Sequence, residues 1–207
     1  MCRVVSLVGG SAVGKDRILR QVLKEPTDRI KPIISTTSRP MRNGEIQGRE
    51  YNFVSKEKAE EMMFKHEFIE FREYYPTTGK WNDRWIYGIS KDSIDLNSDI
   101  TYIVIVDFEG LKQLEKYLDE YKINHISFYI STSLQERVRR AVDREGKMTD
   151  IQVLEVLRRM LDDEKNVIPA KDYCDFVIEN ETEGDFYNGV SLIKYSIDVM
   201  EGDLWRI

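Results

Sequence analysis

The 207-residue sequence predicts an α/β fold with a doubly wound parallel sheet. Three features indicate this fold class. Apolar runs of strand length recur along the chain, amphipathic helical segments lie between them, and a glycine-rich turn joins the first strand to the first helix. Strands that alternate with helices form parallel sheets with helices on both faces, and ligands bind beyond the carboxyl ends of the strands. We therefore expect the functional residues where the strands end.

The first strand and the first helix flank the glycine-rich turn. The run RVVSLVG (residues 3–9) is rich in β-branched residues and stops at a glycine, which predicts a buried strand. The segment DRILRQVLKE (16–25) has helical periodicity, with apolar side chains at Ile18, Val22 and Leu23. The chain is therefore expected to run from strand to turn to helix.

The turn itself, GGSAVGKD, has the spacing of a phosphate-binding loop. Gly9 and Gly14 bracket four residues before Lys15, the arrangement whose backbone N–H groups bind nucleotide phosphates while the lysine neutralises their charge. The following helix N-terminus adds N–H donors and a positive dipole end, whereas a structural turn without a ligand is the alternative. We predict a sheet of the P-loop NTPase type in which Lys15 is catalytic and ATP is bound by Gly9, Gly10, Ser11, Ala12, Val13, Gly14, Lys15 and Asp16.

Asp16 ends this loop where a serine or threonine that binds magnesium is usual. Mg²⁺ prefers oxygen ligands and retains several waters, so a carboxylate can hold it directly or through water. We predict a Mg²⁺ site at Asp16. The alternative is that its carboxylate only complements the helix dipole, a contribution of roughly 0.3–1 kcal/mol.

Three further strands are predicted in the second half of the chain. TYIVIVDF (101–108), HISFYIS (125–131) and CDFVIEN (174–180) are nearly continuous apolar runs, typical of strands buried on both faces of a parallel sheet. The helical segment EGLKQLEKYLDEY (109–121) connects the first two. Asp107 ends the first of these strands, so we expect it at the ligand-binding edge of the sheet.

Two arginine-rich helices are predicted next. The segment STSLQERVRRAVDREG (131–146) has capping-box spacing between Ser133 and Glu136 and a glycine that can end the helix. A second capped helix begins after Thr149 and carries IQVLEVLRRMLDDEKN (151–166). We expect three of its side chains to face the core, namely Leu154, Leu157 and Leu161.

Arginines follow one face of the first of these helices. Arg137, Arg140 and Arg144 recur at i, i+3 and i+7, whereas Arg139 points elsewhere. Such a pattern is often a solvated face balanced by carboxylates. Beside a phosphate loop it instead predicts a movable lid that excludes water and stabilises a transferring phosphoryl group. We assign this catalytic role to Arg140, Arg144 and Arg159.

Charge and hydropathy exclude other classes of function. A formal net charge of −6 argues against non-specific binding to nucleic acid. No apolar run approaches the roughly 18–20 residues of a membrane helix, and MCRVVSLVGG is too short for a signal peptide. The two cysteines and two histidines are isolated in the sequence, so we expect neither a disulfide nor a zinc site. We predict a cytoplasmic protein that binds neither membranes nor nucleic acid.

One long segment resembles a known family. STTSRPMRNGEIQGREYNFVS (35–55) is similar to the acceptor-binding segment of guanylate kinases, S-T-T-R-x-P-R-x-G-E-x-x-G-x-x-Y-x-F-V. The segments EFIEF, WIYGIS and IVDFEG and the arginine-rich helices then follow in the order of that family. The resemblance implies one guanylate-kinase-like domain over 1–207, with a core (1–34, 91–132 and 170–207), an acceptor-binding lobe (35–90) and a lid (133–169).

The resemblance also implies which residues bind the acceptor phosphate. In the family, arginines and a tyrosine of this segment hold it, which here implies Arg39, Arg42 and Tyr51. Guanidinium forks and a phenol suit the oxygens of a phosphate. Ser38 stands where the first of these arginines is usual, so Arg39 is a shifted substitute. Tyr87 is predicted to complete the acceptor site.

The acceptor base is matched less closely. The family reads guanine with two carboxylates, which Glu70 and Asp107 match, and carboxylates can accept from the N1–H and the exocyclic amine of guanine. Two serines that also read guanine in the family are replaced here by Ile34 and Ile89. Ser35 and Ser90 are adjacent to these positions, so a shift of one residue would turn them inward.

Two further departures concern the hairpin and the metal. Residues 72–86 are longer than the connection of the family and predict a protruding hairpin, with turn residues Gly79 and Asn82. Ile105 takes the place of an aspartate that lies near the magnesium waters in the family. Because Asp16 is gained as that aspartate is lost, we interpret the pair as a relocation of metal-supporting charge.

Together these observations predict ATP-dependent phosphoryl transfer to a nucleoside monophosphate, with Mg²⁺ and GMP or dGMP as the expected acceptor. The alternatives are another nucleoside monophosphate, deoxy or modified, or ribose 1,5-bisphosphate, because a loop ending in G-K-D also resembles the kinases of that sugar. A third alternative is a phosphopeptide-binding module without catalysis, as in scaffold proteins similar to guanylate kinases, although these typically lack a working phosphate loop.

Overall fold

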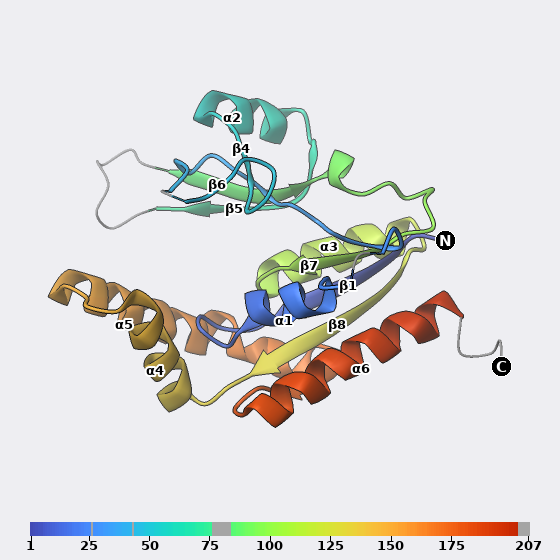
Figure 1. The fold of residues 1–207 in the computed structure, drawn as a ribbon. Coiled ribbons are helices and arrows are strands. Elements are labelled where there is room, and N and C mark those ends of the chain that lie inside the picture. Colours follow the sequence, from blue (N-terminus) through green and yellow to red (C-terminus); the bar gives the residue numbers. More distant parts are fainter. Residues whose placement is uncertain (26, 43, 76–83, 203–207) are drawn as a thin grey trace.

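A parallel sheet of five strands lies at the centre of the structure (Figure 1). The structure is a computed structural model that describes residues 1–25, 27–42, 44–75 and 84–202. All neighbouring strands of this sheet run parallel, and β1 lies in the middle, between β7 and β8. The predicted doubly wound fold is therefore confirmed. The order across the sheet is β2 (Ile30–Pro32), β7 (Thr101–Ile105), β1 (Arg3–Val8), β8 (Asn124–Ser131) and β9 (Phe176–Glu179).

Helices cover both faces of the central sheet. Side chains alternate along β1, so Val4 and Val8 pack toward α3 (Phe108–Glu120), while Val5 and Leu7 pack toward the other face. The second face is covered by α1 (Lys15–Val22) and α6 (Glu183–Glu201). Every residue of β1 is buried, as its run rich in β-branched residues predicts.

The segment predicted to be the acceptor-binding lobe, called the second lobe below, has a sheet of its own. Its strands lie in the order β4-β3-β6-β5, and α2 (Lys56–Phe64) packs against them through Ala59 and Met62. The predicted hairpin of 72–86 has two antiparallel arms, in which Tyr74 lies opposite Trp85, and 76–83 lie outside the described residues. The strands are β3 (Thr36–Thr37), β4 (Asn52–Phe53), β5 (Phe68–Tyr74) and β6 (Trp85–Ser90), followed by the short helix η1 (Lys91–Ser93).

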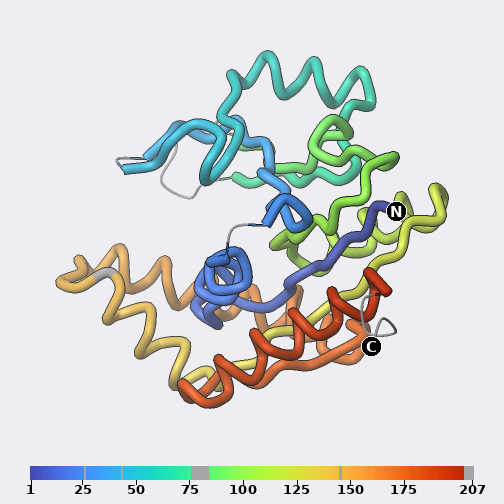
Figure 2. The backbone as a smooth tube through the Cα atoms, turned by 45° about the vertical axis from the view of Figure 1, so that its right-hand side comes forward, coloured from blue at the N-terminus to red at the C-terminus, as the bar shows by residue number. Residues whose placement is uncertain are grey.

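Two helices, α4 (Leu134–Glu145) and α5 (Asp150–Asn166), form the predicted lid and precede the short helix η2 (Ile168–Asp172). The hydroxyl of Ser133 caps α4, and Thr149 forms a complete capping box with Gln152 at the start of α5. In both ribbon and tube views, the two helices project to the same side of the central sheet as the β5–β6 hairpin (Figures 1 and 2).

The expected burial of the leucines on α5 is wrong. Leu154 and Leu161 are 65% and 66% exposed, and Leu157 is also exposed. The buried side chains are instead Val156 and Met160, which pack against Ala141 of α4. Asp163 lies on the same face of α5 as Val156 and Met160, and it pairs with a buried arginine of α4. This contact holds that face toward α4. The periodicity of α5 alone does not reveal it.

Candidate active site

The phosphate loop needs glycine at both of its ends. Gly9 has φ +154°, and a Cβ there would lie 2.6 Å from the carbonyl oxygen of Ile130. Gly14 has φ +98° and is the N-cap of α1. A Cβ there would lie 2.6 Å from Nδ2 in the side chain of Asn180. The loop therefore folds tightly against β8 and the segment after β9, and α1 begins at Lys15.

Lys15 is held inside the loop. Its Nζ donates to the carbonyl oxygens of Gly9 (2.6 Å) and Gly10 (2.8 Å). Burial lowers the pKa of the Lys15 amine to about 8, while the nearby carboxylates of Asp16 and Asp163 act in the opposite direction. Most of the amine is therefore charged at neutral pH, as binding of phosphate requires.

A cavity of about 170 Å³ brings six predicted residues together, four of them charged. Lys15 and Asp16 lie on its loop side, and Arg144 of α4 and Arg159 of α5 lie on its lid side. Three cations and one carboxylate suit a polyphosphate with a divalent cation. The remaining lining residues are Ser11, Ala12, Ala141, Val156 and Met160.

Asp16 has the chemistry of a partial magnesium ligand. It is exposed in the first turn of α1 and lines the same cavity as Lys15. Within 1–25, 27–42, 44–75 and 84–202, no cluster of three or more His, Cys, Asp or Glu side chains could hold a metal ion without help. Proteins commonly bind Mg²⁺ through one or two carboxylates together with phosphate oxygens and water.

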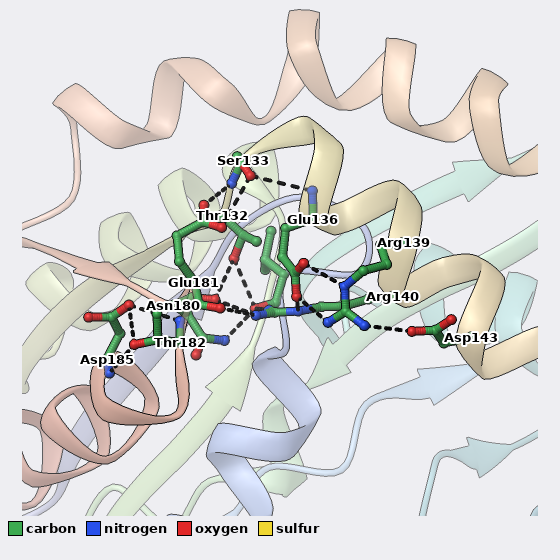
Figure 3. Close-up of polar contacts among 11 residues, drawn as sticks. Thr132, Ser133, Glu136, Arg139, Arg140, Asp143, Asn180, Glu181, Thr182 and Asp185 are labelled. Carbon is green, nitrogen blue, oxygen red and sulfur yellow. Dashed lines mark hydrogen bonds and ion pairs between the residues drawn. The ribbon is translucent and has the colours of Figure 1, made fainter.

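Arg140 is not among the residues that line the cavity, and its side chain instead extends toward Asn180 (Figure 3). Its Nε donates to Glu136 (2.8 Å), and its NH groups donate to the carbonyl oxygens of Val13 (3.2 Å) and Asn180 (2.6 Å). In this structure the arginine therefore ties α4 to the backbone of the phosphate loop. Arg139 points away from the loop, as predicted, and pairs with Glu136 and Asp143.

Two residues that bind the loop were not predicted as site residues. Arg137 is 1% exposed; its Nε donates to the carbonyl oxygen of Ser11 (2.9 Å), and its other nitrogens pair with Asp163 and Glu164 of α5. The carboxylate of Asp163 also accepts from the backbone N–H of Ser11 (2.6 Å). The arginine periodicity pointed to Arg137, whereas no local motif identifies Asp163.

The predicted residues for the acceptor phosphate cluster in the second lobe. Arg39 is 4% exposed and forms a two-pronged pair with Glu45, at 2.9 and 2.8 Å. Its guanidinium lies 5.4 Å from the ring centre of Tyr51, which makes an edge-to-face contact with Tyr87 at 5.9 Å. Glu45 thus holds Arg39 beside both tyrosines, and Arg39 lowers the pKa of Glu45 to about 2.

Arg42 is placed at the exposed rim of this cluster. Its backbone N–H donates to Glu45 at 2.7 Å, and its charge acts to lower the pKa of Tyr87, which burial raises. The backbone of Arg42 is therefore held by the same carboxylate that pairs with Arg39. Glu45 was not predicted as a site residue, although it belongs to the G-E pair of the predicted acceptor segment.

The two carboxylates predicted to read the base lie close together. Glu70 on β5 is 2% exposed, and burial raises its pKa to about 7. Asp107 caps α3 by accepting from the N–H of Gly110 (2.8 Å). Arg72 stands between them: one of its terminal nitrogens pairs with Asp107, and its Nε lies 4.0 Å from Glu70. No motif predicted Arg72.

Two isoleucines occupy the positions of the serines that read guanine in guanylate kinases. Ile89 is fully buried and Ile34 half-buried. Ser90 is buried as well, but its hydroxyl lies 2.9 Å from that of Ser93, at the start of the chain segment that leaves the lobe. The hydroxyl of Ser90 is therefore engaged locally, and the isoleucine side chains offer no hydrogen-bond donor to a base.

Comparison with known proteins gives a consistent result. The family model "Guanylate kinase" matches residues 1–193. A guanylate kinase of Clostridioides difficile is 34% identical over 175 residues, which are 84% of this chain and 77% of that protein. A guanylate kinase of Vibrio cholerae is 29% identical, over 83% and 76% of the two chains.

The fold has a matching solved structure. A crystal structure of guanylate kinase from Anaplasma phagocytophilum superposes with a TM-score of 0.60 at 19% identity, covering 96% of this chain and 85% of that one. Separately, none of the described helices is both long enough and apolar enough to cross a membrane.

Proposed function

Because the chain belongs to the guanylate kinase family and is a nucleoside monophosphate kinase, we propose that it transfers the γ-phosphoryl group of ATP to GMP or dGMP. The observation that carries this proposal is the division of the site into two parts. The cavity at Lys15 suits the donor phosphates, and the second lobe carries Arg39, Tyr51 and the buried carboxylate of Glu70. The products are the nucleoside diphosphate and ADP. The predicted cytoplasmic location belongs to the same proposal.

On the donor side, Lys15 and the loop N–H groups hold the β- and γ-phosphates of ATP. Arg144 and Arg159 face this loop across the cavity, so they stabilise the negative charge that spreads over the transferring group. Arg140 was predicted for the same role. Its contacts with the carbonyl oxygens of Val13 in the loop and Asn180 after β9 support a positioning role.

On the acceptor side, Arg39, Arg42, Tyr51 and Tyr87 bind the phosphate of the monophosphate. Glu45 holds the Arg39 fork in a fixed position, so less side-chain entropy is lost when the phosphate binds. The acceptor oxygen attacks the γ-phosphorus directly, and no covalent enzyme intermediate is required. Catalysis then rests on placing the two phosphates in line and on excluding water between the lobes.

Mg²⁺ bound to the nucleotide supplies neutralising charge to the phosphates. Asp16 would hold it, directly or through water, because its carboxylate lines the cavity beside Lys15. Asp16→Asn should raise the Mg²⁺ concentration needed for half-maximal turnover by about tenfold or more and leave the unfolding midpoint nearly unchanged. Identical magnesium titration curves for the variant and wild type would leave only the helix-dipole role.

The acceptor is identified by an ADP-release assay with ATP and Mg²⁺. GMP, dGMP, the other ribo- and deoxyribonucleoside monophosphates and ribose 1,5-bisphosphate are offered in parallel, with Lys15→Ala as the control. We expect turnover with GMP or dGMP and a loss of at least about 1,000-fold in the control. Selective turnover of another acceptor would contradict the guanine assignment, and ATP binding without turnover would point to an acceptor outside this set. Absence of both ATP binding and turnover would favour the binding-module alternative.

A further inference from the structure

The base end of the acceptor site contains two polar atoms without partners. Among the described residues, Oε2 of Glu70 and Nε of Arg72 are both buried and form no hydrogen bond. They lie 4.0 Å apart, which is too far for a hydrogen bond to each other. Buried donors and acceptors are normally satisfied, so each unmet atom indicates a missing partner. Here one acceptor and one donor are unmet side by side.

The surrounding elements hold this pair in place. Glu70 and Arg72 are two residues apart in β5 and lie on the same face of the strand. The strand packs on α3, and Asp107 is the N-cap of that helix. Asp107 engages one terminal nitrogen of Arg72 and also accepts from the N–H of Gly110. The guanidinium is thereby fixed at one end, while its Nε lies 4.0 Å from Oε2 of Glu70.

The missing partner must present an acceptor next to a donor. The Watson–Crick edge of guanine does so, because its O6 accepts and the neighbouring N1–H donates. We propose that Arg72 determines acceptor specificity, with its Nε–H donating to O6 of guanine while Oε2 of Glu70 accepts from N1–H. This inference rests on the proposed function, since it requires a guanine nucleotide as the acceptor.

The same arrangement of donor and acceptor disfavours the binding of adenine. In the same position, adenine would place its 6-amino group against the Nε–H donor and its N1 lone pair against the carboxylate of Glu70. Both contacts would then be repulsive, and a site built for hydrogen bonds rejects such analogues strongly. Ile34 and Ile89 lack polar side-chain groups, so Arg72 supplies the donor for O6 that the isoleucines cannot provide.

The test compares nucleotides that differ at one atom. GMP and 6-thioguanosine monophosphate share N1–H, but sulfur at position 6 is a much weaker acceptor than oxygen. We expect wild type to prefer GMP by about tenfold or more in kcat/KM. Arg72→Ala should lower kcat/KM for GMP by a similar factor, through KM for GMP rather than KM for ATP, and should bring the two nucleotides within about threefold of each other.

Two further variants control for stability and charge. Arg72→Met keeps most of the side-chain length without any N–H donor, and it should lose the same preference. Arg84→Ala removes an arginine from the neighbouring strand end, where it pairs with Glu60 and Glu73 at the surface, and it should keep the preference of wild type. The unfolding midpoint of each variant shows whether a loss comes from the site.

The outcomes separate this inference from the proposed function. If Arg72→Ala leaves the preference for GMP over the thio analogue unchanged, Arg72 does not contact O6. An equal loss with GMP, AMP and CMP would also overturn the inference, because it would assign Arg72 to the phosphate or to general support of Asp107. Absence of guanine nucleotide turnover by wild type would instead refute the proposed function, and the inference would fall with it.

Discussion

The surroundings of Glu70 disfavour the ionised form of its carboxyl group. Burial raises its pKa from the usual 4.5 to about 7, Asp107 acts in the same direction, and Arg72 on its own strand opposes both. Without a ligand, the protonated form therefore predominates below about pH 7. A ligand that donates to Oε2 would favour the ionised form, so binding of guanine and ionisation of Glu70 should be coupled.

This titration makes the stability of the unliganded protein depend on pH. The folded state retains the Glu70 proton up to about pH 7, whereas the unfolded chain releases it near 4.5. The contribution is thus fully stabilising below pH 4.5 and is lost as the pH rises to 7. Compared with wild type, Glu70→Gln should become relatively more stable between pH 5 and pH 8, by up to about 3 kcal/mol.

Urea unfolding of both proteins at the two pH values measures this change. The Gln side chain is uncharged throughout, so any change in the difference between the two proteins reports on Glu70. A difference in stability that stays constant from pH 5 to pH 8 would show that Glu70 titrates near its ordinary value. Single residues of this kind are poorly predicted from sequence, because the pKa depends on burial by β6 and α3.

At the scale of elements, α4 and α5 are bound to the phosphate loop through buried charges. Arg137 of α4 contacts Ser11 of the loop and pairs with Asp163 and Glu164 of α5. Asp163 also accepts from the N–H of Ser11. The loop and both helices therefore share one network, and the orientation of α5 is set by it.

Removing Asp163 should destabilise this part of the protein. Asp163→Ala leaves the guanidinium of Arg137 buried with Glu164 as its remaining carboxylate partner, so we expect the free energy of unfolding to fall by about 3 kcal/mol. Asp162→Ala is the matched control, because Asp162 is 58% exposed and its pair with Arg158 contributes at most about 1 kcal/mol. Equal losses in urea unfolding would argue against a dominant role of the buried network.

The same elements show what the sequence could predict. Helix caps at Ser133 and Thr149 were correctly inferred, because a cap depends on residues three positions apart. The buried face of α5 was not, since Leu154 and Leu161 have the right periodicity but Val156 and Met160 meet α4. Local signals identify a helix, while its partner decides which face is buried.

At the scale of the whole molecule, the predicted order of strands and helices is present, and the divisions among core, acceptor lobe and lid remain proposals. Long apolar runs predicted the central sheet, and one loop motif located Lys15 and Asp16. Asp163 and Arg72 were missed because their partners, Ser11 and Asp107, lie 152 and 35 residues away. The phosphate loop was predictable, but the long-range pairs around it were not.

The face of β5 that carries Glu70 and Arg72 ends at the lid. The next residue on that face, Tyr74, lies with its hydroxyl 3.3 Å from Glu155 and 3.2 Å from Arg158, both on α5. One strand thus connects the proposed base-reading residues with the helix that carries Arg159. The second lobe and α5 contact each other at this point.

The position of β1 in the middle of the sheet has a consequence for synthesis of the chain on the ribosome. β1 is made first, yet its two neighbours are Thr101–Ile105 and Asn124–Ser131. In a nascent chain, the strand that precedes the phosphate loop therefore stays unpaired until Thr101–Ile105 have been added. The second sheet, contained within residues 36–90, needs no later segment for its pairing and is complete on the chain before β1 gains a partner.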